Sequence, residues 1–570
     1  MNTASYKLPN DLQAAVDTSL ADWQRHNNTA RLWDKDASLW SNRDEAKWLD
    51  WLSAVPVKPD SLEELRAFAS EINTAGFRQV VLLGMGGSSM GPEVLRDTFG
   101  VASGCPDLLV LDSTDPGQVK AVDDAVDLAQ TLFIVASKSG STLEPNILKA
   151  YFFQRVVDSV GADRAAGHFV AITDPLSSLE KAAKAEGFRH IFYGKPQIGG
   201  RFSVLSNFGL VPAALLGVDL PRYLDTTLEM VRACSVNDAP ADNPGVLLGT
   251  ILGAAAGLGR DKLMIVASPG AASFGAWLEQ LLAESLGKEG KSIIPVDAEP
   301  LAAADGYGND RVFAYLRLES ETDAGQDAAI QKLESAGHPV VRITMQDAYN
   351  LGQEFFRWEI ATAVAGAIMG INPFDQPDVE ASKIGTRKLM EAFEASGQLP
   401  AETPLIEEAH ISLYTDAANA TALCEAAGEG ASLADYLCAH LDRTAAGDYL
   451  ALLAYIARNE PHNALLQQLR LRLRDKYKVA LCLGFGPRFL HSTGQAYKGG
   501  ANNGVFLQIT SDHALDLPVP GHGYSFGTVE AAQAQGDFGV LAERGRRVLR
   551  VHLGPDIGAG LKQLDKLLFR

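Results

Sequence analysis

The chain has 570 residues, a length that predicts roughly two to four domains. Hydrophobic residues make up 46% of it and charged residues 21%, which is ordinary for a packed globular protein and excludes a largely disordered chain. The formal net charge of -20 repels nucleic acid and anionic membranes, so we expect neither as a partner.

Residues 1–60 are predicted to form a helical lead-in. Residues 1–22 contain no apolar stretch of the signal-peptide type. The five cysteines of the chain are scattered and form no CxxC pair, so we expect buried thiols in a reducing compartment and not a disulfide framework. A cytoplasmic location follows as an expectation. Large tryptophan side chains usually anchor such a peripheral segment to a core, and this one carries Trp23, Trp33, Trp40, Trp48 and Trp51.

From about Gly76, short apolar runs alternate with turn residues and helical patterns. This alternation predicts a doubly wound α/β domain, with a parallel sheet covered on both faces, over residues 61–240. The runs lie at 80–83, 108–111, 132–136 and 169–172. A second set lies at 263–266, 312–316 and 340–343 and predicts a second domain of the same kind over residues 241–400.

The turn-rich stretch 237–244 is the expected boundary between these two domains. The most apolar run, 245–259, is short and rich in Gly and Ala, so we interpret it as a buried helix and not as a membrane span. Residues 401–570 contain helical sequence, one strong strand at 479–484 and glycine-rich loops. We expect them to form a C-terminal extension that packs on the second domain and contributes to the active site.

Two loops that connect a predicted strand to a predicted helix carry residues suited to a phosphate. Glycines in the loop 84–91 let the backbone approach a ligand, although such a turn can also serve tight packing alone. The loop 137–142 groups four hydroxyls and an ammonium, which match the acceptors of a phosphate monoester. An elaborate helix N-cap is the alternative, but a cap needs only one hydroxyl. The groups belong to Ser137, Lys138, Ser139, Ser141 and Thr142.

Two cations stand out further along the chain. Arg201 follows two glycines, and a guanidinium on such a turn can stabilise charge on a substrate oxygen or make a structural ion pair. Lys383 should lie in the first turns of a helix opened near Pro377, where an ordinary surface lysine is the default interpretation.

A helical pattern over residues 274–286 carries the candidate general base. Glu284 shares one side of this helix with Gln280, four residues earlier. A carboxylate at the end of a helix that enters a pocket can move a proton, and a solvated polar edge is the alternative. Composition does not choose between Glu284 and Glu279.

Taken in order, these motifs resemble those of the phosphoglucose isomerases. The serine-rich loop alone indicates only the wider sugar-isomerase (SIS) domain superfamily. Three further patterns narrow the resemblance: Gly-Gly-Arg-aromatic-Ser at 199–203, Glu-Ser-x-Gly-Lys at 284–288 and Phe-Asp-Gln-x-x-Val-Glu-x-x-Lys at 374–383. The whole chain is most similar to the isomerase half of bacterial bifunctional transaldolase/phosphoglucose isomerases, without a transaldolase portion. The resemblance implies that the two α/β domains are of the SIS type.

The resemblance also implies roles for single residues. Glu284 matches the proton-transferring base, Arg201 the arginine that stabilises the enediolate, and Lys383 the lysine near the ring oxygen. The substrate and its phosphate are expected to contact the two loops and the Phe-Asp-Gln motif through Gly87, Ser88, Ser137, Lys138, Ser139, Ser141, Thr142 and Gln376.

The chain departs from the family pattern at the ring-opening histidine. Family members carry it in a helix that reads His-x-x-x-Gln-x-x-His-x-Gly before the Phe-Asp-Gln motif, and no such pattern follows Glu284 here. A related pattern lies at 491–500, so we interpret the segment as moved in sequence. His491 matches the first histidine, and Lys498 replaces the second, on the same face if the segment is helical. A histidine titrates near neutrality unaided, so His491 is the preferred ring-opening residue and Lys498 the reserve. A role for both in capping or pairing alone is the alternative.

The expected activity is the reversible isomerisation of D-glucose 6-phosphate and D-fructose 6-phosphate through a cis-enediol(ate). No cofactor is expected because the redox change is internal to the substrate. No metal is expected either, because the sequence has no HExxH or clustered Cys/His pattern.

Two alternatives remain open: an isomerase that also accepts mannose 6-phosphate, and a non-catalytic SIS regulator that binds sugar phosphate. Typical family members are dimers with shared active sites, so a homodimer is one expectation. The other expectation is that the moved segment completes the active site within one chain.

Overall fold

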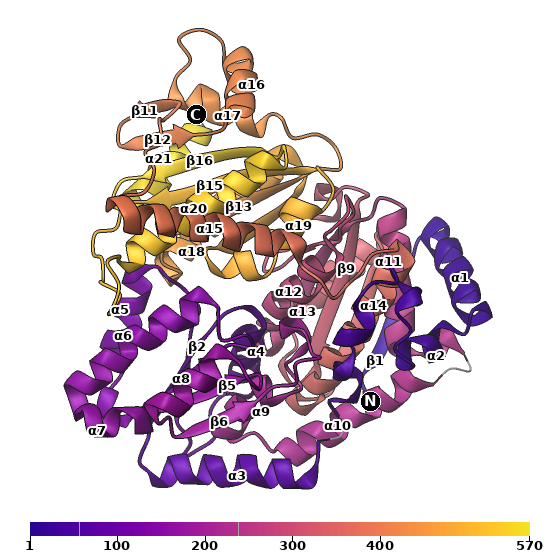
Figure 1. Cartoon of the computed structure of the whole chain (residues 1–570). Coiled ribbons are helices and arrows are strands. Elements are labelled where there is room, and N and C mark those ends of the chain that lie inside the picture. The colour runs from indigo at the N-terminus through magenta and orange to yellow at the C-terminus, as the bar shows by residue number, and fades with distance from the viewer. Residues whose placement is uncertain (56, 237–238, 570) are drawn as a thin grey trace.

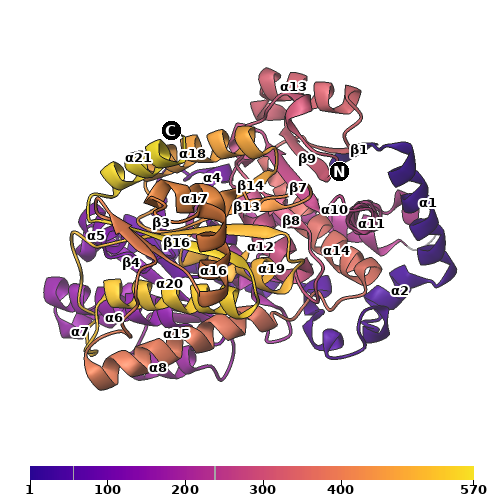
Figure 2. The same cartoon turned by 90° about the horizontal axis from the view of Figure 1, so that it is seen from above.

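Three β-sheets flanked by helices make up the chain in the computed structural model, which describes residues 1–55, 57–236 and 239–569 (Figures 1 and 2). In Figure 1 the first sheet is purple, the second pink except for the indigo strand at its edge, and the third orange to yellow. Asn237 and Asp238, at the start of the expected boundary 237–244, lie outside the described residues.

The first sheet has the strand order β3-β2-β4-β5-β6 and is parallel throughout, as predicted. Its central strand β4 is buried at every position, because helices cover both faces. The strand order reverses between β2 and β4, and ligands of open α/β sheets bind outside the carboxyl ends of the strands at such a reversal. The strands are β2 (Gln79–Gly84), β3 (Asp107–Leu111), β4 (Thr131–Ala136), β5 (Phe169–Thr173) and β6 (His190–Tyr193).

The second sheet has the order β1-β10-β9-β7-β8, parallel except for β1, which pairs antiparallel with β10 at the edge. Its three predicted strands are confirmed. β1 belongs to the expected helical lead-in, which therefore begins with a strand. The strands are β1 (Thr3–Lys7), β7 (Lys262–Ala267), β8 (Ile294–Val296), β9 (Arg311–Leu318) and β10 (Val340–Met345).

The third sheet corrects the expectation of a C-terminal extension with one strand. It has six strands in the order β11-β12-β16-β15-β13-β14, and its four parallel strands are wound like those of the second sheet. The strands are β11 (Ile406–Glu408), β12 (Ile411–Tyr414), β13 (Tyr449–Tyr455), β14 (Ala480–Phe485), β15 (Gly504–Ser511) and β16 (Arg547–Leu553). The predicted strand at 479–484 is β14.

The helices connect the strands and cover the sheets. Those up to the second sheet are α1 (Asn10–Arg25), α2 (Asn28–Trp33), α3 (Pro59–Thr74), α4 (Met90–Phe99), α5 (Pro116–Ala125), α6 (Leu143–Val160), α7 (Ala162–Ala165), α8 (Ser178–Glu186), α9 (Asn207–Leu215), α10 (Leu220–Ser235) and α11 (Pro244–Gly257). Those after it are α12 (Phe274–Leu286), α13 (Ala324–Ser335), α14 (Leu351–Met369), α15 (Pro377–Ser396), α16 (Ala417–Ala427), α17 (Leu433–Leu441), α18 (Glu460–Tyr477), α19 (Gly494–Gly499), α20 (Phe526–Glu543) and α21 (Ile557–Leu568). In Figure 1, α15 runs beside α20 of the third sheet, and the two helices are in contact.

The apolar run at 245–259 is the buried helix α11, as predicted. A Cβ on Gly249 would lie 2.4 Å from the carbonyl oxygen of Ala361, so the glycine allows α11 to pack closely on α14. Across the described ranges, no helix combines the length and apolarity that crossing a membrane requires. The expectation of buried cysteines holds for Cys234 and Cys482, whereas Cys424 is exposed.

Candidate active site

The glycine turn after β2 is where the segments of the candidate site meet. A Cβ on Gly87 would lie 1.9 Å from the carbonyl oxygen of Gly200. A Cβ on Gly86, whose φ is +56°, would lie 2.7 Å from Nε2 of Gln280 and 3.2 Å from Cβ of His491. Only glycine permits these approaches. The turn therefore contacts the segment before Arg201, the helix α12 and the segment after β14.

Arg201 is buried, and its guanidinium is fixed by hydrogen bonds. Nε donates to Oγ of Ser285 at 2.7 Å, and Nη2 donates to the carbonyl oxygen of Pro373 at 2.7 Å. Nη1 lies 3.2 Å from Oε1 of Glu284 and donates to Oε1 of Gln376 at 3.1 Å. The guanidinium thus joins the Glu-Ser-x-Gly-Lys and Phe-Asp-Gln motifs in space.

Glu284 lies in the last turn of α12 and is 8% exposed, so it is not on a solvated edge. Its Oε1 faces Arg201, and its Oε2 accepts a hydrogen bond of 3.1 Å from Nε2 of Gln280. Glu279, the other candidate, lies beside Asp297 instead, and burial and then this neighbouring carboxylate raise its pKa. The carboxylate held next to the guanidinium is that of Glu284.

Lys288, the last residue of the Glu-Ser-x-Gly-Lys motif, is a second buried cation at this place, and no role was predicted for it. Its Nζ lies 2.7 Å from Oδ1 of Asp375. Burial, with a further contribution from Arg201, lowers the pKa of Lys288 to about 8. The site therefore holds two cations against Glu284 and Asp375.

His491 lies in a 3₁₀ turn after β14 and reaches the first sheet. Its Nε2 is 3.0 Å from Oε1 of Glu144, which sits in the first turn of α6 directly after the serine-rich loop. Nε2 of Gln533 donates to the same oxygen at 2.7 Å. A buried carboxylate thus orients the imidazole. Glu144 was not predicted from the sequence, where its only signal is its place just behind the loop 137–142.

The pKa of Glu144 shows which charges surround it. Burial alone would raise this pKa, but the charge and hydrogen bond of His491 outweigh burial and hold the pKa below its usual value. Lys383, in the second turn of α15, acts in the same direction and therefore lies within electrostatic reach of Glu144. Its Nζ pairs with Oε1 of Glu380 at 2.7 Å, and the side chain is 40% exposed.

The serine-rich loop lies at the carboxyl end of β4, where the strand order reverses, and leads into α6. Thr142 is the N-cap residue of α6, yet its side chain makes no capping hydrogen bond there. The hydroxyls interact with one another: Oγ of Ser139 is 2.9 Å from Oγ of Ser141, and both side chains are exposed. Ser137 accepts a hydrogen bond of 3.2 Å from the amide of Gly140. The loop is therefore not simply a helix cap.

The other predicted binding residues do not join these hydroxyls. Lys138 lies within the loop, and Gly87 and Ser88 lie in the glycine turn. Nζ of Lys138 is held 2.8 Å from Asp174 and donates to the carbonyl oxygen of Lys195, so its ammonium turns away from the serine hydroxyls. Ser88 is buried in the glycine turn, with Gly87 beside it.

Lys498 lies apart from this group. Its Nζ is 2.5 Å from Oδ1 of Asp537 on α20, and both side chains are almost completely buried. Residues 492–493 separate the 3₁₀ turn of His491 from α19, which carries Lys498, so the two do not share the face of one helix. The structure gives Lys498 the pairing that the alternative interpretation describes.

Gln495, in the same segment, ties three elements together and was also missed. Its Nε2 donates to the carbonyl oxygen of Gly287 at 3.0 Å, and its Oε1 accepts from the amide of Asp378 at 2.9 Å. This glutamine holds α19 against the ends of α12 and α15.

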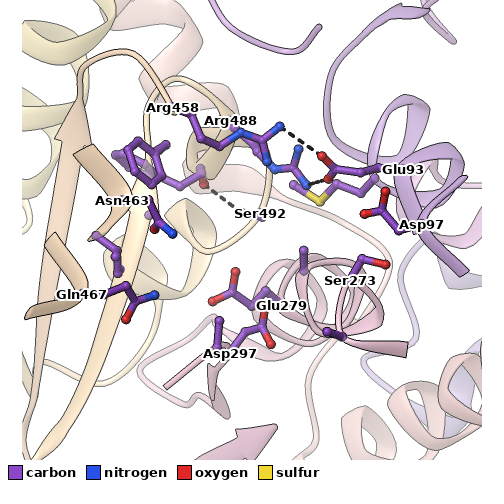
Figure 3. Close-up of a pocket in the computed structure, with 18 of the residues that line it drawn as sticks. Glu93, Asp97, Ser273, Glu279, Asp297, Arg458, Asn463, Gln467, Arg488 and Ser492 are labelled. Carbon is purple, nitrogen blue, oxygen red and sulfur yellow. Dashed lines mark hydrogen bonds and ion pairs between the residues drawn. The ribbon is translucent and has the colours of Figure 1, made fainter. Parts of the chain in front are cut away.

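A cavity of about 570 Å³ opens on the other side of α12 (Figure 3). Glu279 on α12 and Ser273, the residue before this helix, line it, and Figure 3 shows Glu279 beside Asp297. Arg488 spans its upper edge, donating to Asp112 at 2.7 Å and pairing with Glu93. Glu279, the other candidate base, lines this cavity, whereas the residues matched to catalytic roles are not among the described residues that line it: Glu284, Arg201, Lys383, His491 and Lys498.

Comparison with known proteins identifies relatives of this chain. The family model described as phosphoglucose isomerase matches residues 39–297. A probable glucose-6-phosphate isomerase of Methanococcus maripaludis is 30% identical over 344 residues, which cover 54% of this chain and 77% of the relative. A glucose-6-phosphate isomerase of Rubrobacter xylanophilus is 29% identical over 381 residues, covering 58% and 86%.

Two solved structures resemble the fold. A hypothetical protein of Thermus thermophilus superposes with a TM-score of 0.57 and 25% identity, covering 68% of this chain and all of the other. A glucose-6-phosphate isomerase of Chlamydia trachomatis has a TM-score of 0.51 and 21% identity, covering 66% and 79%. Each of these structures thus leaves about a third of this chain unmatched.

Proposed function

Because the chain belongs to the phosphoglucose isomerase family, we propose that it catalyses the reversible isomerisation of D-glucose 6-phosphate and D-fructose 6-phosphate. The observation that carries this proposal is the pairing of Glu284 with Arg201 beside a glycine turn that also contacts His491. A base can move the proton of an aldose–ketose isomerisation, a fixed guanidinium can stabilise the charge that develops, and an oriented imidazole can open the sugar ring.

The phosphate would bind at the serine-rich loop. The exposed hydroxyls of Ser139 and Ser141 and the uncapped start of α6 offer hydrogen-bond donors, and the amino end of a long helix favours an anion. Lys138 would contribute through its backbone, because its ammonium is held by Asp174. The net charge of the chain does not attract an anion at long range, so these local donors carry the binding.

Ring opening is assigned to His491. A proton must leave the hydroxyl on carbon 1, and the ring oxygen must gain one as its bond to carbon 1 breaks. An imidazole can perform both transfers, and Glu144 would hold the ring in place and stabilise its protonated form. Lys383 would add positive charge near the same position.

The isomerisation itself is assigned to Glu284. Its carboxylate would take the proton from carbon 2 and return it to carbon 1 through a cis-enediolate. As Glu284 becomes neutral, the negative charge moves to the enediolate oxygen, and Arg201 next to it stabilises that charge without moving. The second cation, Lys288, adds to this positive potential.

The contact of His491 with Glu144 supports completion of the site within one chain, in which the moved histidine segment would supply the ring-opening residue without a second subunit. A homodimer and a cytoplasmic location stay predictions, as does the acceptance of mannose 6-phosphate. Membership of an isomerase family favours an enzyme over the non-catalytic regulator.

A pair of matched variants tests the proposal. In a coupled assay for conversion of fructose 6-phosphate to glucose 6-phosphate, we expect Glu284→Gln to lower kcat by about 10²–10⁴-fold, the usual contribution of a general base. Glu279→Gln is the control, because it makes the same change on another face of the same helix, and it should keep most of the activity. The opposite ranking of the two variants, or a wild type without turnover, contradicts the proposal.

A further inference from the structure

Three potential metal ligands meet where the first and third sheets face each other. Asp115 follows β3 and precedes α5, His513 follows β15, and Glu530 lies on α20. One ligand atom from each lies within 4.8 Å of the other two. Nε2 of His513 is 3.3 Å from Oε2 of Glu530. Two ligands on a tetrahedral zinc ion, each at about 2.0–2.1 Å, are about 3.3–3.4 Å apart, so this pair already has the required separation.

Apart from its 3.3 Å contact with His513, Glu530 lacks, among the described residues, the hydrogen-bond partners that a buried carboxylate needs. The residue is 2% exposed, and neither Oε1 nor Oε2 has a hydrogen-bond partner within the described part of the chain. Asp115, also 2% exposed, places a second carboxylate against it. Two buried carboxylates cannot both stay ionised side by side unless a cation lies between them. The side chain of Glu530 therefore points into a position suited to a positive charge.

The other two ligands are held in place by their surroundings. Oδ1 of Asp115 accepts the amide of Gln118 at 2.8 Å as the N-cap of α5, which fixes the carboxylate and leaves its other oxygen available. A Cβ on Gly527 would lie 2.7 Å from Cδ2 of His513, so the glycine at the start of α20 leaves room for the ring. The side chains are thus placed before any ion binds.

We propose that Asp115, His513 and Glu530 bind one divalent transition-metal ion of the zinc type. An imidazole with two carboxylates is a donor set that zinc accepts, whereas calcium and magnesium prefer oxygen ligands alone. A cavity of about 580 Å³ lined by Asp115, His462 and His513 provides access and room for water as a further ligand.

Such an ion would join the two sheets next to the candidate active site. Thr114, beside Asp115, donates to Oε1 of Gln533 at 2.7 Å. Gln533 lies about one turn after Glu530 on α20, and it donates to Glu144, which holds His491. The ion would therefore be a positioning device for the imidazole. This consequence rests on the proposed function, whereas the binding of the ion does not.

The test measures zinc binding to the chelator-treated full chain without substrate, by titration calorimetry and by metal analysis after dialysis. We expect one zinc ion per chain, and Co²⁺ in its place should show visible d–d absorption of a low-symmetry site. Glu530→Gln and Asp115→Asn keep the side-chain shapes, and the asparagine keeps the helix cap. Each should weaken zinc binding by about 10–100-fold or more.

Asp512→Asn is the matched control. Asp512 adjoins His513, but its exposed carboxylate pairs with His552 at 3.2 Å outside the cluster, so this variant should bind zinc like the wild type. Circular dichroism of metal-free Glu530→Gln checks its fold, which should be intact because the change removes a buried charge. A wild type that binds no zinc overturns the proposal, and so do variants at Asp115 and Glu530 that bind it unchanged. Neither result bears on isomerase activity.

Discussion

His491 and Glu144 are separated by 347 positions in sequence and by 3.0 Å in space. A carboxylate such as Glu144 affects turnover only through the histidine that it orients and whose charged form it stabilises. We expect Glu144→Gln to lower kcat by roughly 10–100-fold, because the amide keeps one hydrogen bond but loses the charge. The coupled assay measures this, with Asp123→Asn, which alters a buried carboxylate paired with Arg155 elsewhere on the first sheet, as the control. An unchanged kcat would mean that the pair is only structural.

Lys498 and Asp537 form a buried ion pair, and removing one partner leaves the other charge uncompensated. We expect Lys498→Met to reduce the free energy of unfolding by about 3–5 kcal/mol. The double variant Lys498→Met/Asp537→Leu should recover most of that loss, because both charges are gone. Urea unfolding gives these values, and kcat of the double variant should stay near that of the wild type. A stable double variant without activity would return Lys498 to the list of catalytic residues.

Residues of the candidate site could be predicted from sequence only where a motif specifies a single position. The Gly-Gly-Arg and Glu-Ser-x-Gly-Lys patterns placed Arg201 and Glu284, and the structure puts them 3.2 Å apart. Glu279 could not be rejected from sequence, because only the position of the guanidinium separates the two carboxylates. Glu144 could not be found, because its partner comes from a sheet whose position depends on tertiary packing.

At the scale of the element, α17 carries a histidine that the fold keeps neutral. Burial, with Arg443 acting in the same direction, lowers the pKa of His440 to about 3. Its Nε2–H donates to the carbonyl oxygen of Phe506 at 3.0 Å, since a carbonyl can only accept. In the unfolded chain this histidine takes up a proton as the pH falls below its ordinary pKa of 6.5. In the folded chain it does so only near its lowered pKa of about 3. Stability is therefore lost as pH falls through this window.

Urea unfolding at about pH 7 and about pH 5 should show this loss. For one such histidine, the free energy of unfolding falls by roughly 2 kcal/mol between the two pH values. His440→Gln keeps a donor for the carbonyl of Phe506 but cannot be protonated, so its stability should depend less on pH by about that amount. Equal pH dependence in both proteins would mean that His440 does not contribute.

The prediction of strands was correct where an apolar run ends at turn residues before a helical pattern, as in β2, β4 and β7. The third sheet was missed for a physical reason. β13 reads Tyr-Leu-Ala-Leu-Leu-Ala-Tyr, and a continuous apolar run of this length fits a buried strand or a buried helix equally well. Pairing with β14 and β15 decides between them, and that pairing joins residues far apart in the chain.

At the scale of the whole molecule, the proposed site draws on residues that the three sheets position, and the proposal takes them from one chain. Mixing Glu284→Gln with His491→Ala should therefore restore no activity, because each site lacks one of its own residues. If subunits instead shared sites across a two-fold interface, mixed dimers would contain one intact site. The assay compares the mixture with each variant alone after dissociation and reassociation, and recovered turnover would contradict a site within one chain.

The late position of His491 also sets the order in which the protein matures on the ribosome. Arg201 and then Glu284 emerge before it, and Glu284 precedes it by about 200 residues, which at typical synthesis rates is roughly 10–40 s. Throughout that interval a nascent chain holds the base and the guanidinium but has no imidazole opposite Glu144. Turnover is thus the last property that each new molecule acquires, after most of its polypeptide has left the exit tunnel.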